Sequence, residues 1–217
     1  MSERSEGING HSNAVEVTGL GVRLGGYPVF SEVNLSVAPG EILAVLGGIG
    51  SGKTTLLRVL GGELAPSAGS VRVLGYPPAE AIESGEVVLV CGEPKWEPGA
   101  GVLQVLELAR MAGSQVEDDT WPIPPRVMEA FELDAKCDDQ PHTLSQGLRR
   151  RLALAAAFCR PSQLLLIDDP EYGLDDRFRP LLADILRGYA DRGGTAVLGT
   201  HDLDLAVGAQ ARTFALD

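Results

Sequence analysis

The sequence predicts an α/β fold in which a mostly parallel core sheet is preceded by a small antiparallel β subdomain and interrupted by an inserted helical lobe. Three observations predict it. Wholly apolar runs that end in glycine or aspartate, typical of strands buried on both faces, alternate with segments of helical spacing. In residues 15–37, apolar and polar residues alternate in short pieces, as in strands that have one solvent-exposed face. From residue 93 to residue 140 the chain has helix-like segments around an acidic, proline-rich break.

The length and composition of the chain indicate how many domains it forms. With 217 residues and 44% hydrophobic content, the chain can bury a core of its own and suits one domain. The first 13 residues, MSERSEGINGHSN, are polar and lack the apolar core of a secretory signal, so they predict a disordered start. We expect a single domain over 14–217, with the helical lobe at about 93–150.

Charge and cysteine usage exclude several classes of protein. The formal charge of −12 argues against binding nucleic acid, which needs clustered Lys and Arg. The three cysteines are far apart and show no C-x-x-C spacing, so they predict neither disulfides nor a zinc site and fit a reducing cytoplasm. The longest apolar runs are too short for a bilayer, which takes ~20 residues, so any membrane role must come through a partner.

The elements expected after the antiparallel segment follow from these patterns. EILAVLGG, residues 41–48, predicts a buried strand that runs into a loop, and GKTTLLRVLGGEL predicts a helix from the spacing of its leucines. SVRVLG and EVVLVCG predict two strands, at 70–75 and 86–92, and GVLQVLELARM and RVMEAFEL predict the helices of the lobe. The remaining expected elements are a helix at about 146–159, the strand QLLLIDD, a helix at about 177–192, the strand TAVLG, a short helix and the strand RTFALD.

A glycine-rich loop between the first buried strand and its helix predicts a phosphate site. Gly47, Gly52, Lys53 and Thr54 satisfy G-x-x-x-x-G-K-[ST]. Glycines let backbone N–H groups turn toward a phosphate, the helix start adds positive potential, Lys53 reaches the terminal phosphates and Thr54 holds magnesium. A chance match is remote in this strand–loop–helix context. The full set expected to bind the nucleotide here is Gly47, Gly48, Gly50, Ser51, Gly52, Lys53, Thr54 and Thr55.

Two acids at the end of QLLLIDD fit the same chemistry. A magnesium nucleotide site needs a carboxylate at the end of a neighbouring buried strand, and Asp168 is the expected metal-side carboxylate. Asp169 is then placed to orient or deprotonate the attacking water. Taken without the phosphate loop, the segment would favour two solvated acids at a strand end.

The stretch LSQGLRRRLAL, residues 144–154, places a small hydroxyl-bearing turn before a helix. Ser145, the flexible Gly147 and the helix start supply donors for a second anion. Of the three arginines that follow, Arg149, Arg150 and Arg151, we expect two to lie on a solvated helix face.

These motifs together resemble the nucleotide-binding domain of the ATP-binding cassette (ABC) family, from Val15 to the C-terminus. LSQGL resembles that family's signature loop, which contacts the γ-phosphate held by the phosphate loop of a second cassette. The resemblance implies a P-loop NTPase that binds and hydrolyses MgATP as a homo- or heterodimer. It also implies a separate integral membrane transporter subunit, and hence a cytoplasmic protein on the inner face of the membrane.

Further site residues are implied by the resemblance. Tyr27, in a GGYPVF turn, resembles the aromatic that stacks on adenine, although a single tyrosine in a turn is more often packing. His201, in GTHD, resembles the switch histidine that contacts the γ-phosphate, where a histidine at a strand end would otherwise be polar surface. Leu174 and Asp175, in EYGLDD, resemble the loop that passes signals across the dimer interface.

Three departures from the family pattern bear on catalysis. Asp169 stands where Glu is usual, and its carboxylate ends roughly 1 Å further back, which can cost on the order of 100-fold in rate. Gly92 falls where a Gln contacts magnesium and water, with Glu93 beside it as a substitute of the same length. Gln146 and Leu148 replace the commoner Gly and Gln of the signature. We therefore expect ordinary MgATP binding and slow hydrolysis.

Two other classes of function share these motifs. Soluble cassette proteins that act on DNA or ribosomes commonly carry two cassettes, coiled-coil insertions or basic arms, none of which this sequence shows. A regulatory cassette that binds ATP as a conformational switch is supported only by Asp169 and Gly92. The transporter interpretation is preferred, with the lobe segment 93–111 as the expected docking region for the membrane subunit.

Overall fold

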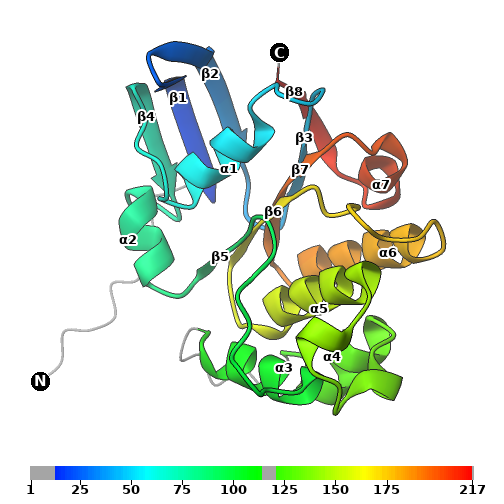
Figure 1. Ribbon diagram of the computed structural model, residues 1–217. Helices are drawn as coiled ribbons and strands as arrows, with labels where there is room; N and C mark the ends of the chain where they lie inside the picture. Colours follow the sequence, from blue (N-terminus) through cyan, green and yellow to red (C-terminus); the bar gives the residue numbers. More distant parts are fainter. Residues whose placement is uncertain (1–12, 114–120, 217) are drawn as a thin grey trace, which may run out of the picture.

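The computed structural model describes residues 13–113 and 121–216. Apart from Asn13, the expected disordered start at 1–13 lies outside the described residues, and so do residues 117–120, the first four of the acidic break EDDTWPIPP. The described chain forms an antiparallel sheet, a parallel sheet and the helices around them (Figure 1).

The antiparallel sheet has the order β2-β1-β4 and is built from β1 (Val15–Leu24), β2 (Tyr27–Val37) and β4 (Ala68–Val73). The short pieces expected between residues 15 and 37 are two strands of 10 and 11 residues. The register shifts near Gly19 and Glu32, which have φ of +58° and +56°. Such bulges insert an extra residue and break the alternation without ending the strand.

The parallel sheet has the order β5-β6-β7-β3-β8, and every neighbouring pair in it is parallel. This sheet confirms the predicted α/β class. The carboxyl ends of its strands meet at one edge, which is where ligands bind in open α/β sheets. Its strands are β3 (Ile42–Leu46), β5 (Val87–Val90), β6 (Leu164–Asp168), β7 (Thr195–Thr200) and β8 (Arg212–Ala215).

The two faces of the parallel sheet are covered by different helices. In β6, Leu164 and Leu166 join the core formed with α1 (Lys53–Leu60) and the antiparallel sheet. Leu165 and Ile167 join the core formed with α5 (Gln146–Cys159) and α6 (Phe178–Asp191). Each fully buried Leu or Ile contributes ~1.5–3 kcal/mol by leaving water. The helix after the glycine-rich loop and the helix after LSQGL therefore lie on opposite faces.

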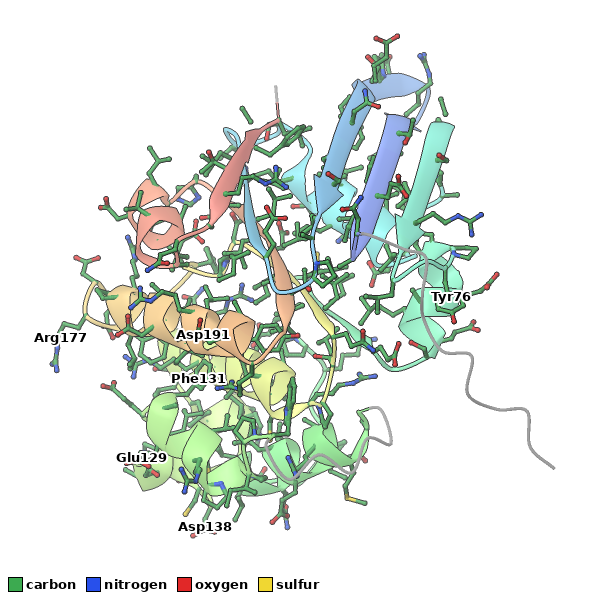
Figure 2. The ribbon with its side chains drawn as sticks, turned by 180° about the vertical axis from the view of Figure 1, so that it is seen from behind. Tyr76, Glu129, Phe131, Asp138, Arg177 and Asp191 are labelled. Carbon is green, nitrogen blue, oxygen red and sulfur yellow. The ribbon has the colours of Figure 1, made fainter. Side chains whose placement is uncertain are left out.

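The lobe packs against the α5 face. It contains α3 (Val102–Met111), α4 (Pro124–Ala130) and the 3-10 turns η1 (Asp134–Lys136) and η2 (Pro141–Thr143). Phe131 holds it in place, with its ring 5.7 Å from Phe158 and 5.8 Å from Phe178. Glu129 and Asp138 lie at its outer end (Figure 2).

Two short helices complete the fold. α2 (Pro78–Glu83) was not expected, because six residues are too few to show helical periodicity. α7 (Leu203–Gly208) is the expected short helix before the last strand and packs on α6. Among the described residues, no helix combines the length and the apolar character needed to cross a bilayer.

Candidate functional site

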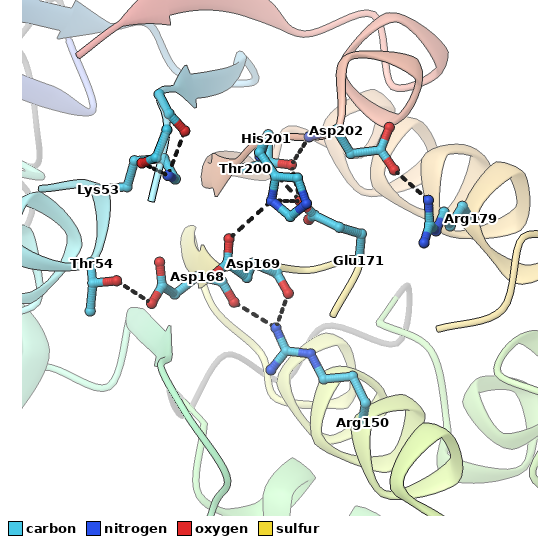
Figure 3. A network of polar contacts seen from close by, with 12 residues as sticks. Lys53, Thr54, Arg150, Asp168, Asp169, Glu171, Arg179, Thr200, His201 and Asp202 are labelled. Carbon is cyan, nitrogen blue, oxygen red and sulfur yellow. Dashed lines mark hydrogen bonds and ion pairs between the residues drawn. The ribbon is translucent and has the colours of Figure 1, made fainter. Parts of the chain in front are cut away.

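The predicted site residues of the core meet at the carboxyl edge of the parallel sheet (Figure 3). Gly47 follows β3, Asp168 ends β6 and His201 follows β7, and β7 lies between the other two strands. Sequence segments more than 100 residues apart thus contribute to one polar network: Thr54 Oγ1 donates to Asp168 Oδ2 at 2.7 Å across a separation of 114 residues.

The glycine-rich loop turns back on the start of α1. Lys53 is buried, and its ammonium donates to the carbonyl oxygens of Gly47 at 2.7 Å and Gly48 at 2.9 Å. Gly52 caps α1 with φ of +100°, and a Cβ there would lie 2.8 Å from the Phe30 ring. Only glycine fits such a position. Ser51 and Thr55 flank this turn and are half-buried.

Thr54 and Asp168 have the ligand chemistry of a magnesium site. Besides the oxygen that accepts from Thr54, Asp168 has a second oxygen, Oδ1, that is buried without a hydrogen-bond partner among the described residues. Burial raises the pKa of the Asp168 carboxyl above its usual value and the charge of Asp169 acts in the same direction, while the Thr54 hydrogen bond opposes them. One alcohol and one carboxylate beside a phosphate loop fit Mg²⁺, which keeps several waters and takes few protein ligands.

Asp169 begins the turn after β6 in a left-handed backbone conformation, with φ of +42°. Its N–H donates to the carbonyl of Gly199 at 2.7 Å. Arg150 donates to the carbonyl oxygens of Asp168 at 2.6 Å and Asp169 at 2.8 Å. These contacts fix the backbone of the turn through both its N–H and its carbonyl groups. The backbone therefore sets the position from which the half-exposed carboxylate of Asp169 extends (Figure 3).

One carboxylate in this turn was not predicted from the sequence. Glu171 is 3% exposed and accepts hydrogen bonds from the Thr200 hydroxyl at 2.6 Å and from the N–H of His201 at 3.2 Å. The Nδ1 atom of His201 lies 3.1 Å from Glu171 and 3.7 Å from Asp169. No periodicity or motif marks Glu171, since a Glu in a turn is ordinarily solvated.

The expectation that two of the three arginines after LSQGL are solvated is wrong. Arg150 and Arg151 are each 9% exposed, and Arg149 is half-buried. Arg151 pairs with Asp175 at 2.7 Å and stacks on Phe178, with 4.0 Å between its guanidinium carbon and the ring centroid. α5 is buried almost all round, so its first turn has no solvated face. The arginines bind their own chain.

Ser145 remains available for an anion at the start of α5. It is exposed and caps the helix, with its hydroxyl accepting from the N–H of Leu148 at 3.3 Å. Gly147 approaches the Gly173 carbonyl, which would lie 2.9 Å from a Cβ at this position. α1 and α5 cover opposite faces of the sheet, so the helix that Ser145 caps does not share the face of the helix that follows the glycine-rich loop.

Tyr27 stands at the first position of β2 with 79% of its surface exposed. Two and three residues further on, Val29 and Phe30 pack against Gly52 of the glycine-rich loop. The exposed ring is therefore carried by a strand that contacts the loop, which suits a base-stacking role.

Gly92 and Glu93 line a cavity of about 260 Å³ that reaches Asp168 and Asp169. Gly92 has φ of +73° and presents no side chain to the site. Glu93 lies 2.7 Å from the Arg149 guanidinium, so its carboxylate pairs with the helix after LSQGL. This pairing directs Glu93 toward α5 and leaves the expected Gln position without a side chain.

Comparison with known proteins decides the family. The family model described as "ABC transporter" matches residues 30–171, from the β2 residue that packs on the glycine-rich loop to Glu171. The chain belongs to the ABC transporter family. It is an ATP-binding cassette, the part of that family that carries ATP-dependent chemistry.

Two relatives are similar in sequence to most of this chain. The cytochrome c biogenesis ATP-binding export protein CcmA 2 of Cupriavidus metallidurans is 36% identical over 202 residues, which cover 90% of this chain and 92% of that protein. SCO2324 of Streptomyces coelicolor, described as an ABC transporter ATP-binding protein, is 38% identical over 89% of this chain. The chain spans only 34% of that second relative.

A solved structure shows the same fold. It is the dimeric ATP-binding cassette MJ0796, described in a post-hydrolysis state bound to ADP and Pi, with a TM-score of 0.78 and 22% identity over 94% of each chain. At this identity the likeness concerns the ABC cassette fold.

Proposed function

We propose that this chain binds and hydrolyses MgATP as one half of a cassette dimer and drives transport through a separate integral membrane subunit. The observation that carries the proposal is that Lys53, Thr54 and Asp168 lie together at the sheet edge, while an exposed Ser145 starts α5, which covers the opposite face of the sheet from α1. One chain then offers a phosphate loop to one nucleotide and a signature loop to another. A second cassette completes both sites.

The residues divide the chemistry among them. Lys53 brings a buried positive charge to the loop that holds the terminal phosphates. Thr54 and Asp168 would hold magnesium, which when bound would neutralise charge on the phosphates. Asp169 orients or deprotonates the attacking water, and His201 contacts the γ-phosphate. Tyr27 stacks on the adenine, while Ser145, Gly147 and Asp175 act across the dimer interface.

Slow hydrolysis is part of the proposal. Asp169 is one methylene shorter than Glu, and Gly92 supplies no polar group to the water or the metal. The left-handed φ of Gly92 also disfavours any other residue at this position. If the second cassette is a different chain, it contributes its own catalytic residues to the other site. A regulatory cassette that binds ATP and scarcely hydrolyses it is the alternative that Gly92 favours.

A groove on the lobe fits the membrane subunit. It has a volume of about 450 Å³ and is lined by α3 and the segment before it, including Glu97, Glu107, Leu108 and Met111. Leu108 is 49% and Met111 79% exposed. Exposed apolar side chains rimmed by acids suit an amphipathic segment with basic residues. Docking there would place the cassette in the cytoplasm at the inner face of the membrane.

Purification from native membranes tests the proposal. The tagged chain is recovered from membranes solubilised in mild detergent, and the bound proteins are identified by mass spectrometry. A stoichiometric multi-span membrane protein is the expected result, and a second, different cassette would explain the weakened catalytic positions. Recovery only from the soluble fraction, alone or with ribosomal or DNA-processing proteins, contradicts it.

A further inference from the structure

Glu171 is a buried carboxylate that the proposed reaction does not use. It lies two residues after Asp169, in the turn that follows β6, and is 3% exposed. Leaving such a charge buried without compensation costs several kcal/mol, so buried carboxylates are paired or hydrogen-bonded. The donors that compensate Glu171 therefore show what it is built to hold.

Among the described residues, the hydrogen-bond donors to Glu171 come from the end of β7 and the residue after it and reach only Oε1, while Oε2 is buried without a partner. Its Oε1 atom accepts from the Thr200 hydroxyl at 2.6 Å and from the N–H of His201 at 3.2 Å, and it lies 3.1 Å from Nδ1 of the His201 ring. The Thr200 hydroxyl in turn accepts from the N–H of Asp202 at 2.9 Å. One oxygen thus fixes both the backbone and the ring of His201 (Figure 3).

The ring needs such a partner because little else holds it. The His201 side chain is 68% exposed, and besides Glu171 the carboxylate that lies near Nδ1 among the described residues is Asp169, at 3.7 Å. Without Glu171, Nδ1 would turn to Asp169 and engage the carboxylate proposed to act on water. With Glu171 holding Nδ1, the remaining nitrogen, Nε2, is the one that a bound phosphate can meet.

A metal is not needed to explain where Oε1 of Glu171 lies in this cluster. The ligand-type atoms of Asp169, Glu171 and His201 lie within 4.8 Å of one another. However, the close oxygen of Glu171 already receives two hydrogen bonds and faces the ring nitrogen, which accounts for its position.

We propose that Glu171 is the positioning residue for His201: it holds the Nδ1 proton of the ring, presents Nε2 to the γ-phosphate and keeps the ring from pairing with Asp169. The expected effect of Glu171 on the hydrolysis rate rests on the proposed function, whereas its expected effect on the His201 ring rests on geometry alone. A kinetic test and a spectroscopic test separate these two effects.

The kinetic test is a double-mutant cycle. Glu171→Ala should lower kcat on the order of 100-fold, the cost of misplacing a catalytic group by about 1 Å, while KM for ATP changes less than about threefold. Glu171→Gln, which keeps an acceptor for Thr200 and for the ring, should retain most of kcat. In a His201→Ala background, Glu171→Ala should cost nothing further. An equal loss in both backgrounds overturns the proposal.

The spectroscopic test does not depend on hydrolysis. The chain has three histidines, so ¹⁵N-histidine labelling with His201→Ala for assignment isolates the ring of His201. In a two-bond ¹H–¹⁵N spectrum, the neutral ring should carry its proton on Nδ1 in the wild type and in Glu171→Gln. It should lose this preference in Glu171→Ala. The same tautomer in Glu171→Ala overturns the inference, and a chain without ATPase activity but with the predicted tautomer shift contradicts only the proposed function.

Discussion

Arg150 is predicted to be the arginine that holds the turn after β6, which begins at Asp169. Arg150→Met tests this prediction at nearly constant side-chain volume. The guanidinium is 9% exposed and donates to two carbonyl oxygens, at 2.6 and 2.8 Å. Hydrogen bonds that involve a charged group contribute about 1.5–3 kcal/mol each. Burial lowers the pKa of Arg150, so part of this gain offsets the desolvation of its charge.

The net loss of stability on Arg150→Met should be about 2–4 kcal/mol. For a chain of this size, about 2–4 °C in Tm per kcal/mol predicts a fall of roughly 5–15 °C. Arg149→Met is the matched control, because the Arg149 side chain is 30% exposed, donates to only one recorded carbonyl oxygen in the described chain, that of Leu144 at 2.9 Å, and pairs with a Glu93 side chain that is 64% exposed. Exposed pairs contribute about 1 kcal/mol or less.

Urea unfolding of both variants measures the difference. We expect Arg150→Met to lose clearly more stability than Arg149→Met and also to lose kcat, because the φ of +42° at Asp169 is no longer held. If the two variants are equally stable, the arginines behave as a solvated helix face and the argument from buried contacts is refuted.

Two further predictions concern the acids of this turn. Asp169→Glu should raise kcat by about 10- to 100-fold by bringing the carboxylate forward, and steady-state ATPase assays that show a fall would mean that the site is built around the shorter side chain. Asp168→Asn should stabilise the nucleotide-free protein above about pH 4 while weakening magnesium-dependent nucleotide binding. Because the folded pKa of Asp168 is raised, its ionisation costs stability as pH rises above about 4. The stability advantage of Asp168→Asn should therefore grow between pH 4 and pH 7 in urea titrations, and a constant difference would show that the pKa is not raised.

Sequence patterns predicted the parallel sheet and the phosphate loop because both follow local rules. Buried parallel strands are apolar runs, and a phosphate loop needs glycines, Lys53 and Thr54 at fixed spacing. The length of β1 and β2 could not be predicted in the same way. Bulges at Gly19 and Glu32 interrupt the alternation within continuous strands.

The burial of Arg150 and Glu171 could not be predicted from the sequence for a different physical reason. Arg150 and Glu171 are each compensated by groups from other segments, 18 to 30 residues away in the chain. Periodicity reports the average environment of a helix or strand and carries no information on such pairings. The apolar run LALAAAFC, which continues the helix of the three arginines, is the one local sign that this helix is buried all round.

The central claim is that each nucleotide lies between the phosphate loop of one cassette and Ser145 of another, and the charge at Ser145 tests it most directly. Asp and Asn both cap helices as well as Ser does, so Ser145→Asp and Ser145→Asn keep the cap on α5. Only Ser145→Asp adds a negative charge where the partner's phosphate would lie.

The measurement is the mass of the chain in solution by light scattering, with and without MgATP, in an Asp169→Asn background that slows hydrolysis. We predict an ATP-dependent dimer for the parent and for Ser145→Asn, and a monomer that still binds nucleotide for Ser145→Asp. A Ser145→Asp chain that dimerises with ATP as well as Ser145→Asn would contradict the claim.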